Sequence, residues 1–290
     1  MAAALNHPRG IELLGRGWRA SLDILLNDAK KDLTVVSPYI RSSEANYIAN
    51  GLSPMVNIIT MTRLDDRSLL EGALQLDALR VLGEFSPNSK IINLPRLHAK
   101  VYIADKSRAI ITSGNLTKSG IDLNYEYGVG IANRRLVGEI YHDLSHYATL
   151  GKTCPPHAIG KLSTLVNAAQ QKRINAEEVR WQDSAEKNLR RTLAQLNDEC
   201  QRLYVGDDTP TGLFKKALLY FLAREKLNTK ELHHCIQNLY PELCDSDRHR
   251  IINGRSFGKL WKHHLRNAQQ RLKKEGRIVY NQQNRKWQAI

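Results

Sequence analysis

The sequence predicts an α/β protein in which helices and a mixed sheet form a sandwich in the N-terminal half, while a smaller, basic domain ends the chain. Short apolar runs alternate with amphipathic stretches over residues 1–150, as expected for helices and strands that share one sheet. Residues 151–208 are polar and helix-prone, and residues 209–290 combine helical stretches with two short apolar runs. We therefore expect an α/β domain at 1–150, a helical linker at 151–208 and a second domain at 209–290.

Hydrophobic periodicity and breakers place the elements of the first domain in order. Residues Gly17–Asp28 are expected to form an amphipathic helix. The strand at Asp32–Ile40 ends at Ser37-Pro38, because proline cannot continue a central ladder. Further helices are expected at Ser43–Asn50, Asp66–Phe85 and Arg134–Leu150, and further strands at Val56–Thr62, Ser89–Pro95, His98–Ala104, Arg108–Ser113 and Tyr125–Asn133.

The stretch from Leu97 to Glu126 contains the most chemically informative residues. His98 and Lys100 are two residues apart on an expected strand, so their side chains share a face. An imidazole can act as a nucleophile or a general acid at neutral pH, and a neighbouring ammonium group suits a phosphoryl oxygen. This arrangement indicates a phosphate-handling site.

The spacing H-x-K-x4-D-x6-[GT]-S-x-N resembles that of the phospholipase D superfamily. The positions are occupied by His98, Lys100, Asp105, Thr112, Ser113 and Asn115. Glu126 lies where the nuclease members place a carboxylate partner for the histidine. Thr112 departs from the usual glycine. The order of strands and helices and the Ser37-Pro38-Tyr39 stretch also resemble the nuclease branch, over about the first 150 residues.

The resemblance implies a role for each residue of the motif. His98 of one protomer would attack a phosphodiester phosphorus, and His98 of the partner subunit would protonate the leaving oxygen and then activate water. Lys100 and Asn115 would hold the non-bridging oxygens, and Ser113 would donate a hydrogen bond within the pocket. Glu126 would orient the imidazole, whereas Asp105 would support the structure.

The resemblance also bears on assembly and cofactors. The chain has a single copy of this motif, called HKD after His98, Lys100 and Asp105. Superfamily members need two copies of the motif for one active site. A homodimer with the site on its twofold axis is therefore expected. No metal or other cofactor is expected, because imidazoles and ammonium groups replace a divalent ion. Arg63 is a further candidate contact to the phosphate backbone.

Charge is distributed unevenly along the chain. The formal net charge is +14, which favours a polyanionic partner. Residues 1–150 hold 17 Lys+Arg against 15 Asp+Glu, and residues 151–290 hold 26 against 14. Binding to the polyanion and chemistry are therefore expected in separate parts of the chain.

The second domain has the pattern of a winged helix-turn-helix. Helices are expected at Leu213–Glu225 and Asn228–Tyr240, and a third from near Ser256 to Gly276. Asn228 and Glu231 have capping-box spacing. Two short strands, Arg277–Tyr280 and Arg285–Ala289, would form the wing. The turn at residues 206–212 marks the boundary before this domain.

This domain resembles the winged-helix domain of Mrr-like restriction proteins, through the run from Trp261 to Ile278 and the closing Lys286-Trp287. From Asp245 to the end there are 12 Lys+Arg against 3 Asp+Glu. Double-stranded DNA is the partner that these donors suit, although a basic stripe can also be a solvated face. The candidate DNA-binding residues are Arg255, Lys259, Lys262, His263, Arg266, Gln270, Lys273, Arg285 and Lys286.

The other segments constrain the interpretation less. The linker is either a helical spacer or part of the dimer contact. The four cysteines have no C-x2-C pairing, so neither a structural zinc site nor a disulfide framework is expected. With no signal-type segment or apolar run long enough for a membrane span, a cytoplasmic protein without a membrane partner is expected.

These observations together favour a metal-independent DNA endonuclease, a restriction or phage-defence enzyme with a cognate methyltransferase or another defence-system protein as a candidate partner. Two alternatives stay open. One is a lipid phosphodiesterase, and the other is a DNA-binding regulator with an inactive phospholipase D fold. Binding of DNA without cleavage, unchanged in His98→Ala, would favour the regulator.

Overall fold

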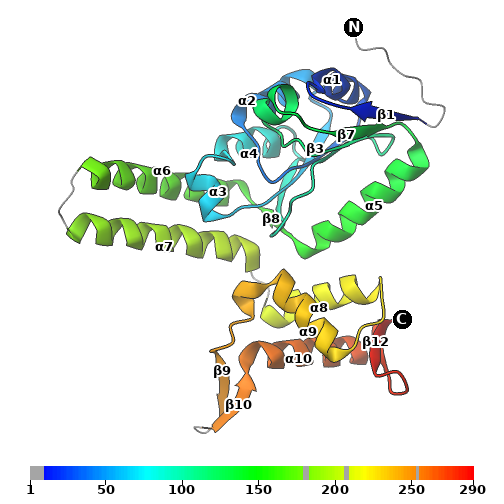
Figure 1. Ribbon diagram of the computed structural model, residues 1–290, viewed down its shortest axis with the longest axis vertical. Helices are drawn as coiled ribbons and strands as arrows, with labels where there is room; N and C mark the ends of the chain where they lie inside the picture. Colours follow the sequence, from blue (N-terminus) through cyan, green and yellow to red (C-terminus); the bar gives the residue numbers. More distant parts are fainter. Residues whose placement is uncertain (1–9, 179–182, 206–208, 253–254) are drawn as a thin grey trace. The chain divides into compact units, whose positions relative to one another are not determined.

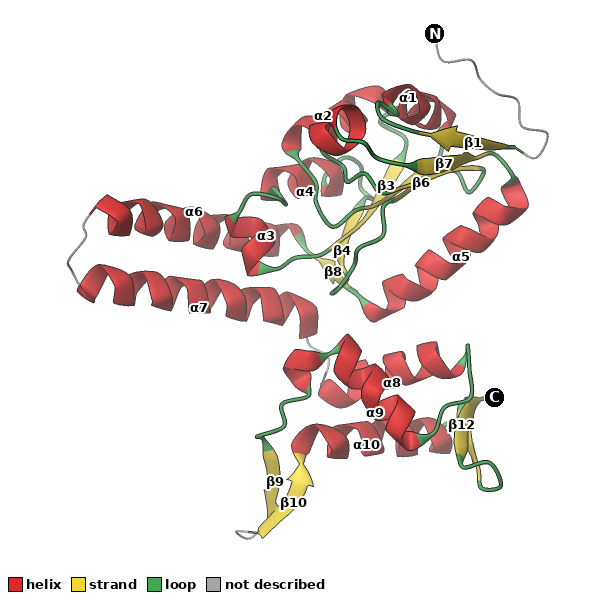
Figure 2. Ribbon diagram, viewed as in Figure 1, coloured by secondary structure: helices red, strands yellow, loops and turns green. Residues whose placement is uncertain are grey.

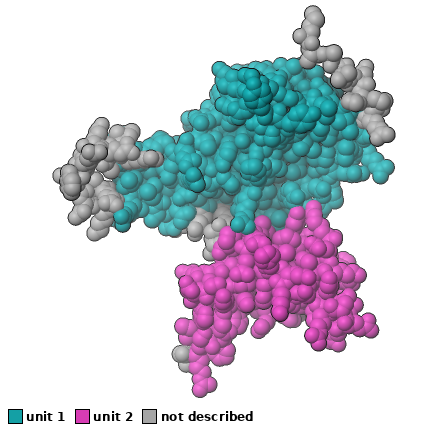
Figure 3. Space-filling view, viewed as in Figure 1, with its two compact units in different colours: residues 1–204 teal, residues 205–290 magenta. Residues whose placement is uncertain are grey.

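The structure is a computed structural model that describes residues 10–178, 183–205, 209–252 and 255–290. It contains two compact units, which are coloured separately in Figure 3. Unit 1 comprises residues 1–204 and unit 2 comprises residues 205–290.

Unit 1 is built on one eight-stranded sheet with the order β1-β7-β6-β5-β2-β3-β4-β8. β2, β3 and β4 run parallel to one another, and the remaining pairs are antiparallel. The predicted α/β class with a mixed sheet is therefore confirmed. The strands are β1 (Ile11–Leu14), β2 (Asp32–Val36), β3 (Asn57–Thr62), β4 (Lys90–Asn93), β5 (Val101–Ala104), β6 (Arg108–Thr112), β7 (Gly128–Ile131) and β8 (Lys152–Cys154).

Helices lie along both sides of this sheet. Figure 1 shows α1, α2 and α4 on one side and α5 on the other. The central strands are buried almost continuously, as expected for a sheet covered on both faces. The helices are α1 (Arg19–Asp28), α2 (Ser42–Gly51), α3 (Asp66–Leu70), α4 (Leu76–Gly83) and α5 (Arg134–Leu150), with a short π-helical turn at Ser119–Leu123.

The register of the sheet determines which loops meet at one of its ends. Val101 of β5 pairs with both Val36 of β2 and Ile111 of β6, and Val36 pairs with Met61 of β3. Thr112 pairs with Gly128. The segments that follow β2, β3 and β6 therefore converge with those that precede β5 and β7, and this end carries the candidate site.

Two of the expected elements of unit 1 differ in the structure. The helix expected at Asp66–Phe85 is interrupted between α3 and α4, because Gly72 adopts a left-handed φ of 66° that ends a helix. The strand expected from His98 begins only at Val101. The ladder nevertheless extends one residue further by a hydrogen bond, since the N–H of Thr112 donates to the carbonyl of Lys100 at 3.2 Å.

The segment expected as a linker forms two long helices, α6 (Pro156–Glu178) and α7 (Asp183–Val205). Apolar residues of both helices join the core of unit 1, among them Leu162, Val166 and Leu196. Lys161 of α6 also forms an ion pair with Glu199 of α7 at 2.7 Å. The compact unit thus extends to Tyr204, past the domain end expected at residue 150.

The described residues of unit 2 form three α-helices and two separate hairpins, and Figure 2 shows these helices in red and the strands in yellow. The buried stripe expected on the third helix is observed, with Trp261, Leu265, Ala268 and Leu272 all buried. The capping box at Asn228 and Glu231 is also formed. The elements are α8 (Pro210–Leu222), α9 (Thr229–Leu239), a 3-10 turn (Pro241–Leu243), β9 (His249–Ile252), β10 (Arg255–Lys259), α10 (Leu260–Lys274), β11 (Ile278–Asn281) and β12 (Lys286–Ala289).

The third helix was expected to begin near Ser256, and this is wrong. Residues Arg255–Lys259 form β10, which pairs with β9, and α10 begins at Leu260. Gly258 has a φ of 91°, which is incompatible with a helix and creates a bulge in the ladder. Arg255 and Lys259 therefore lie on a hairpin and not on the helix.

None of the helices in the described ranges has both the length and the apolar character that crossing a membrane requires.

Candidate active site

His98 and Lys100 lie in contact just before β5. The Lys100 ammonium nitrogen Nζ is 3.2 Å from each ring nitrogen of His98 and donates to the His98 carbonyl at 2.8 Å. Lys100 is buried, with 6% of its surface exposed, whereas His98 is exposed. A sheltered positive charge therefore lies beside an imidazole that a substrate can reach.

The electrostatic surroundings of Lys100 reveal two further members of the site. Burial lowers the pKa of the Lys100 ammonium, the Glu126 carboxylate opposes this effect, and the Arg63 guanidinium adds to it. Arg63 follows β3 and donates to Asp65 at 2.8 Å and to the Tyr39 hydroxyl at 3.1 Å. The end of the sheet thus carries two cations, Lys100 and Arg63, together with the carboxylates of Glu126 and Asp65.

Ser113 and Glu126 form a hydrogen-bonded pair across the start of β7. The Ser113 hydroxyl donates to Glu126 at 2.5 Å and accepts from the Tyr127 N–H at 3.1 Å. The Asn124 amide also donates to Glu126, at 3.1 Å. Within the described residues the hydrogen bonds of Glu126 go to Ser113 and Asn124, and not to the His98 ring that the resemblance assigns to it.

Asn115 lies on a tightly packed loop after β6. A Cβ on Gly114 would come within 2.4 Å of the Gly120 carbonyl oxygen, so this loop has little freedom to shift. Oδ1 of Asn115 is buried and has no hydrogen-bond partner among the described residues. Thr112, which replaces the usual glycine, accepts from the Gly114 N–H at 3.2 Å through its hydroxyl and so supports the turn.

Asp105 lies at the opposite end of β5. Because Ala104 pairs with Arg108, Asp105 occupies the β5–β6 turn, a strand length away from Lys100. Its carboxylate accepts from the N–H groups of Lys30, Lys31 and Asp32 at 2.8–3.0 Å. Burial raises the pKa of Asp105, but these backbone donors outweigh it, so the pKa is lowered overall. The structure places Asp105 in a structural position.

The candidate DNA-binding residues of unit 2 occupy three elements. Lys262, Arg266, Gln270 and Lys273 are exposed along α10, opposite its buried stripe. His263 is half-buried and its Nε2 lies 2.8 Å from the Phe257 carbonyl. On the hairpins, the exposed residues are Arg255 and Arg285, and the partly buried ones are Lys259 and Lys286.

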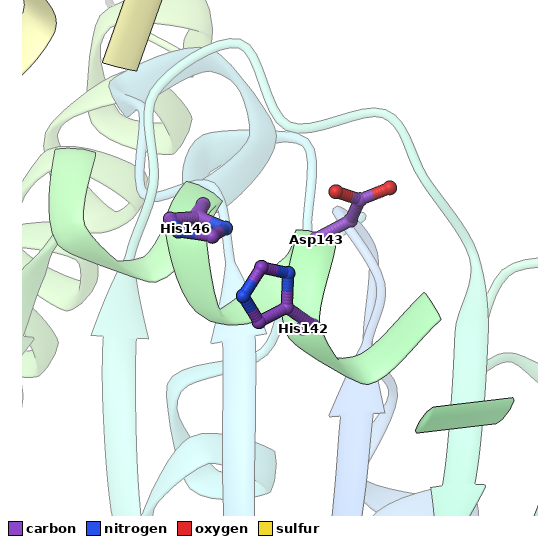
Figure 4. Close-up of side chains that lie close together, drawn as sticks. All are labelled: His142, Asp143 and His146. Atoms are coloured by element: carbon purple, nitrogen blue, oxygen red, sulfur yellow. The ribbon is translucent and has the colours of Figure 1, made fainter. Parts of the chain in front are cut away.

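One group of described residues could hold a metal ion. His142, Asp143 and His146 lie on α5, with one ligand atom of each within 4.8 Å of the others (Figure 4). Nδ1 of His146 is buried and has no hydrogen-bond partner among the described residues. The spacing of these residues on a helix was not recognised in the sequence, although two histidines four apart are a known signal for metal binding.

Tyr39 and Asn124 bind the side chains of Arg63 and Glu126, and neither was predicted as a member of the site. Tyr39 follows the proline that ends β2, so its place at this end of the sheet could have been inferred. Asn124 had no signal in the sequence, because its contact depends on the turn before β7.

Comparison with known proteins gives one family match. Residues 22–147 match a family described as cardiolipin synthase, PLD-like domain. No curated protein matches the chain. Residues 22–147 of unit 1 therefore match a PLD-like domain, and the mixed α/β architecture of unit 1 agrees with that match.

Several solved structures are similar over part of the chain. The phospholipase D family member Nuc from Salmonella typhimurium has 14% identity and a TM-score of 0.41, over 50% of this chain and 98% of Nuc. NucT from Helicobacter pylori has 16% identity and a TM-score of 0.35, over 47% of this chain and 92% of NucT. Phosphatidylserine synthase from Haemophilus influenzae has 11% identity and a TM-score of 0.42, over 81% of this chain and 60% of the synthase.

Proposed function

We propose that this protein is a metal-independent DNA endonuclease in which unit 1 of two protomers hydrolyses phosphodiester bonds and unit 2 binds double-stranded DNA. The observation that carries the proposal is the contact of the buried Lys100 ammonium with the exposed His98 imidazole, 3.2 Å apart. Such a pair suits a phosphodiester, whose negative charge the ammonium neutralises while the imidazole reaches the phosphorus.

The reaction has two steps, and both use His98 of one protomer and His98 of the partner subunit. A ring nitrogen of His98 forms a bond to phosphorus, the bond from phosphorus to the leaving oxygen breaks, and His98 of the partner subunit gives that oxygen a proton. Water then attacks the phosphohistidine, the phosphorus–nitrogen bond breaks, and His98 of the partner subunit takes the proton from the water. The enzyme returns to its starting state without an oxidant, a reductant or a metal ion.

The neighbouring side chains have separate tasks in this scheme. Lys100 stabilises the charge on the non-bridging oxygens, and its burial in a site of low dielectric strengthens that interaction. Asn115, held on its rigid loop, orients the phosphoryl group. The hydrogen bond between Ser113 and Glu126 fixes both side chains at this end of the sheet. Arg63 supplies a second positive charge for the adjoining phosphate.

The homodimer is required by the count of motifs. One protomer supplies a single His98, while the two steps need a nucleophile and a separate acid. A second copy placed across a twofold axis supplies the other imidazole and completes the site. Because one such site cuts one strand at a time, cleavage of both strands takes two successive events.

The basic unit 2 supports DNA as the substrate. From Asp245 onward there are 12 Lys+Arg against 3 Asp+Glu, and an exposed stripe on α10 carries donors suited to phosphates and base edges. Leu227, before α9, also pairs with Trp287 of β12, which links the terminal hairpin to the helices as in a winged helix. A role in restriction or phage defence, with a cognate methyltransferase or another defence protein, follows from the resemblance to Mrr-like proteins.

A lipid phosphodiesterase is the second candidate, and two observations favour it. The matching family is described as cardiolipin synthase. Three apolar or aromatic residues are also exposed around Glu126, namely Leu123 at 50%, Tyr125 at 90% and Tyr127 at 66%. Exposed apolar side chains beside an active site would suit the binding of acyl chains. They would equally suit burial in an interface between two protomers.

A plasmid-cleavage assay in excess EDTA tests the proposal. Wild type is expected to nick and then linearise the plasmid, His98→Ala is expected to do neither, and His142→Ala/His146→Ala is expected to cut like wild type. Loss of cutting in EDTA, restored by a divalent ion in wild type but not in the α5 double variant, would contradict metal independence. Hydrolysis of phosphatidylglycerol vesicles without cleavage of DNA would favour the lipid enzyme.

A further inference from the structure

The hairpin formed by β9 and β10 has no counterpart in the expected fold of unit 2. It lies between α9 and α10 and projects beyond the helices of its unit (Figure 1). Among the described residues its two strands pair only with each other, and an isolated two-stranded hairpin is marginally stable in water. An element of this kind is expected to gain contacts from a partner.

The charge of the hairpin indicates what that partner is. Residues 248–259 include Arg248, Arg250, Arg255 and Lys259 and contain no acidic residue. Arg248 lies 3.8 Å from Asp245, outside the hairpin, and the side chain of Lys259 donates to Ser246 at 2.8 Å. Arg250 and Arg255 are exposed, so they are available to a polyanion.

Strand pairing brings these two arginines to one face together with an aromatic ring. Ser256 pairs with Ile251, and the bulge then sets Phe257 and Gly258 opposite Arg250. Arg255 pairs with Ile252, and Arg250 and Phe257 each lie two residues from one of this pair along its strand, so the side chains of Arg250, Arg255 and Phe257 share a face. Phe257 is 54% exposed. The face therefore presents an exposed ring between two cations.

Ile251 places an exposed apolar side chain on the other face of the hairpin. It is 67% exposed and lies on the side of His249, whose Nδ1 is 2.8 Å from the Ser256 hydroxyl. A ribbon with an apolar side chain on each face and cations along it is unsuited to lying flat on a protein surface. It is suited to a groove whose two walls carry phosphates.

We propose that the β9–β10 hairpin inserts into the major groove of double-stranded DNA, with Arg250 and Arg255 on phosphates and Phe257 against base edges. A two-stranded ribbon fits the major groove, and apolar side chains contact the thymine methyl groups exposed there. The inference rests on the proposed DNA-binding function of unit 2. It adds a second DNA-contacting element beside α10, and most of its strand β10 was predicted from the sequence to be the start of that helix.

The test compares DNA affinity across a salt series for wild type, Arg250→Gln/Arg255→Gln and the matched control Lys226→Gln/Lys230→Gln. The control removes two exposed cations from α9 and the turn before it. The hairpin variant is expected to bind about tenfold more weakly and to have a log–log salt slope smaller by about 2, since each lost phosphate contact removes about 0.9. The control is expected to retain the wild-type slope.

A second variant separates base contact from charge. Phe257→Ala is expected to weaken binding by about tenfold with the salt slope unchanged, because a base-edge contact releases no counterions. Phe257→Leu, which keeps an apolar side chain and a folded hairpin, is expected to recover most of the affinity on a duplex containing thymine and none on one containing only uracil in its place. Thermal unfolding checks that each variant is folded.

The outcomes of this experiment separate the inference from the proposed function. Wild-type affinity and salt slope in both hairpin variants would overturn the hairpin contact, even if the protein cleaves DNA through His98. Wild type that binds no duplex at any salt concentration, together with vesicle hydrolysis, would overturn the proposed function and the inference with it. Weakened binding in the hairpin variants alone supports both.

Discussion

Lys100 carries its positive charge where water reaches little of its side chain. Burial lowers the pKa of its ammonium, which means that the charged form is held at a cost to the stability of the fold. Natural proteins accept such costs at sites of chemistry, where removing the functional group often stabilises the protein. The contact of this ammonium with His98 explains why a buried charge is present at this position.

Lys100→Met is therefore expected to separate stability from activity. Met matches the length of the side chain and removes the buried charge, so the melting temperature is expected to equal or exceed that of wild type. Phosphodiesterase activity is expected to fall by at least about 100-fold, as for the loss of one preorganised electrostatic donor. A lower melting temperature with activity retained would show that Lys100 has a structural role.

Substitution of Asp105 is expected to lower stability and to leave activity intact, which is the reverse of the effect expected for Lys100→Met. Asp105→Asn replaces one acceptor oxygen with a donor facing the backbone N–H groups of residues 30–32. The expected cost is about 1–3 kcal/mol at pH 7, since hydrogen bonds to a charged group are lost. Activity per folded molecule is expected to persist.

The destabilisation by Asp105→Asn has a definite pH dependence. Because the folded pKa of Asp105 lies below its ordinary value of 3.8, its stabilisation is complete above that value and is lost as the pH falls through the folded pKa. Urea unfolding at pH 7 and near pH 3 measures the difference, with the exposed Asp77→Asn as the control. A destabilisation that does not shrink in acid would contradict this account.

At the scale of elements, the loop after β6 is the most constrained part of the site. Gly114 separates Ser113 from Asn115, and its backbone lies against Gly120, whose carbonyl accepts from the Trp18 indole at 2.8 Å. The loop is thereby tied to the start of α1. Any side chain at position 114 must displace backbone, and Asn115 moves with it.

Gly114→Ala is expected to destabilise unit 1 by about 1–3 kcal/mol, the usual cost of overpacking, and to lower activity further than its unfolded fraction explains. The matched control is Gly138→Ala in α5, where an added Cβ has no neighbour within 4 Å. This control is expected to stabilise the helix by about 0.5–1 kcal/mol. Equal activity in both folded variants would show that the loop tolerates displacement.

The elements also show what the sequence could and could not predict. Long apolar runs identified β2, β3 and β6 correctly, because their burial on both faces leaves a strong signal. β1 and β8 were missed, since they are edge strands of 4 and 3 residues whose existence depends on pairing with distant residues. The β9–β10 hairpin was missed because the basic residues of β10 continue the polar pattern of α10.

The candidate site was predictable to a similar degree. The motif identified His98, Lys100 and Asp105, and the register of β5 explains why the first two lie at one end and Asp105 at the other. The link between Ser113 and Glu126 could not be predicted, because it requires the turn before β7 to bring residue 126 back to the end of β6. The expected role of Glu126 in orienting the His98 imidazole stays a prediction.

For the molecule as a whole, the proposed mechanism requires two protomers that share one active site. Mixing wild type with His98→Ala through unfolding and refolding would produce heterodimers that contain a single His98. Activity is then expected to fall with the square of the wild-type fraction, since each heterodimer lacks either the nucleophile or the acid. A linear decline would contradict a shared site and would indicate that one protomer acts alone.

Capture of the covalent phosphohistidine intermediate is the most direct test of the proposed mechanism. Internally labelled plasmid DNA is incubated with protein in excess EDTA and quenched in alkaline detergent, and the protein is then separated from free DNA. Wild type is expected to carry label that resists alkali and is released by acid, as for a phosphohistidine, and His98→Ala is expected to carry none. Cleavage of DNA by wild type with no label on the protein at any quench time would contradict the proposed mechanism.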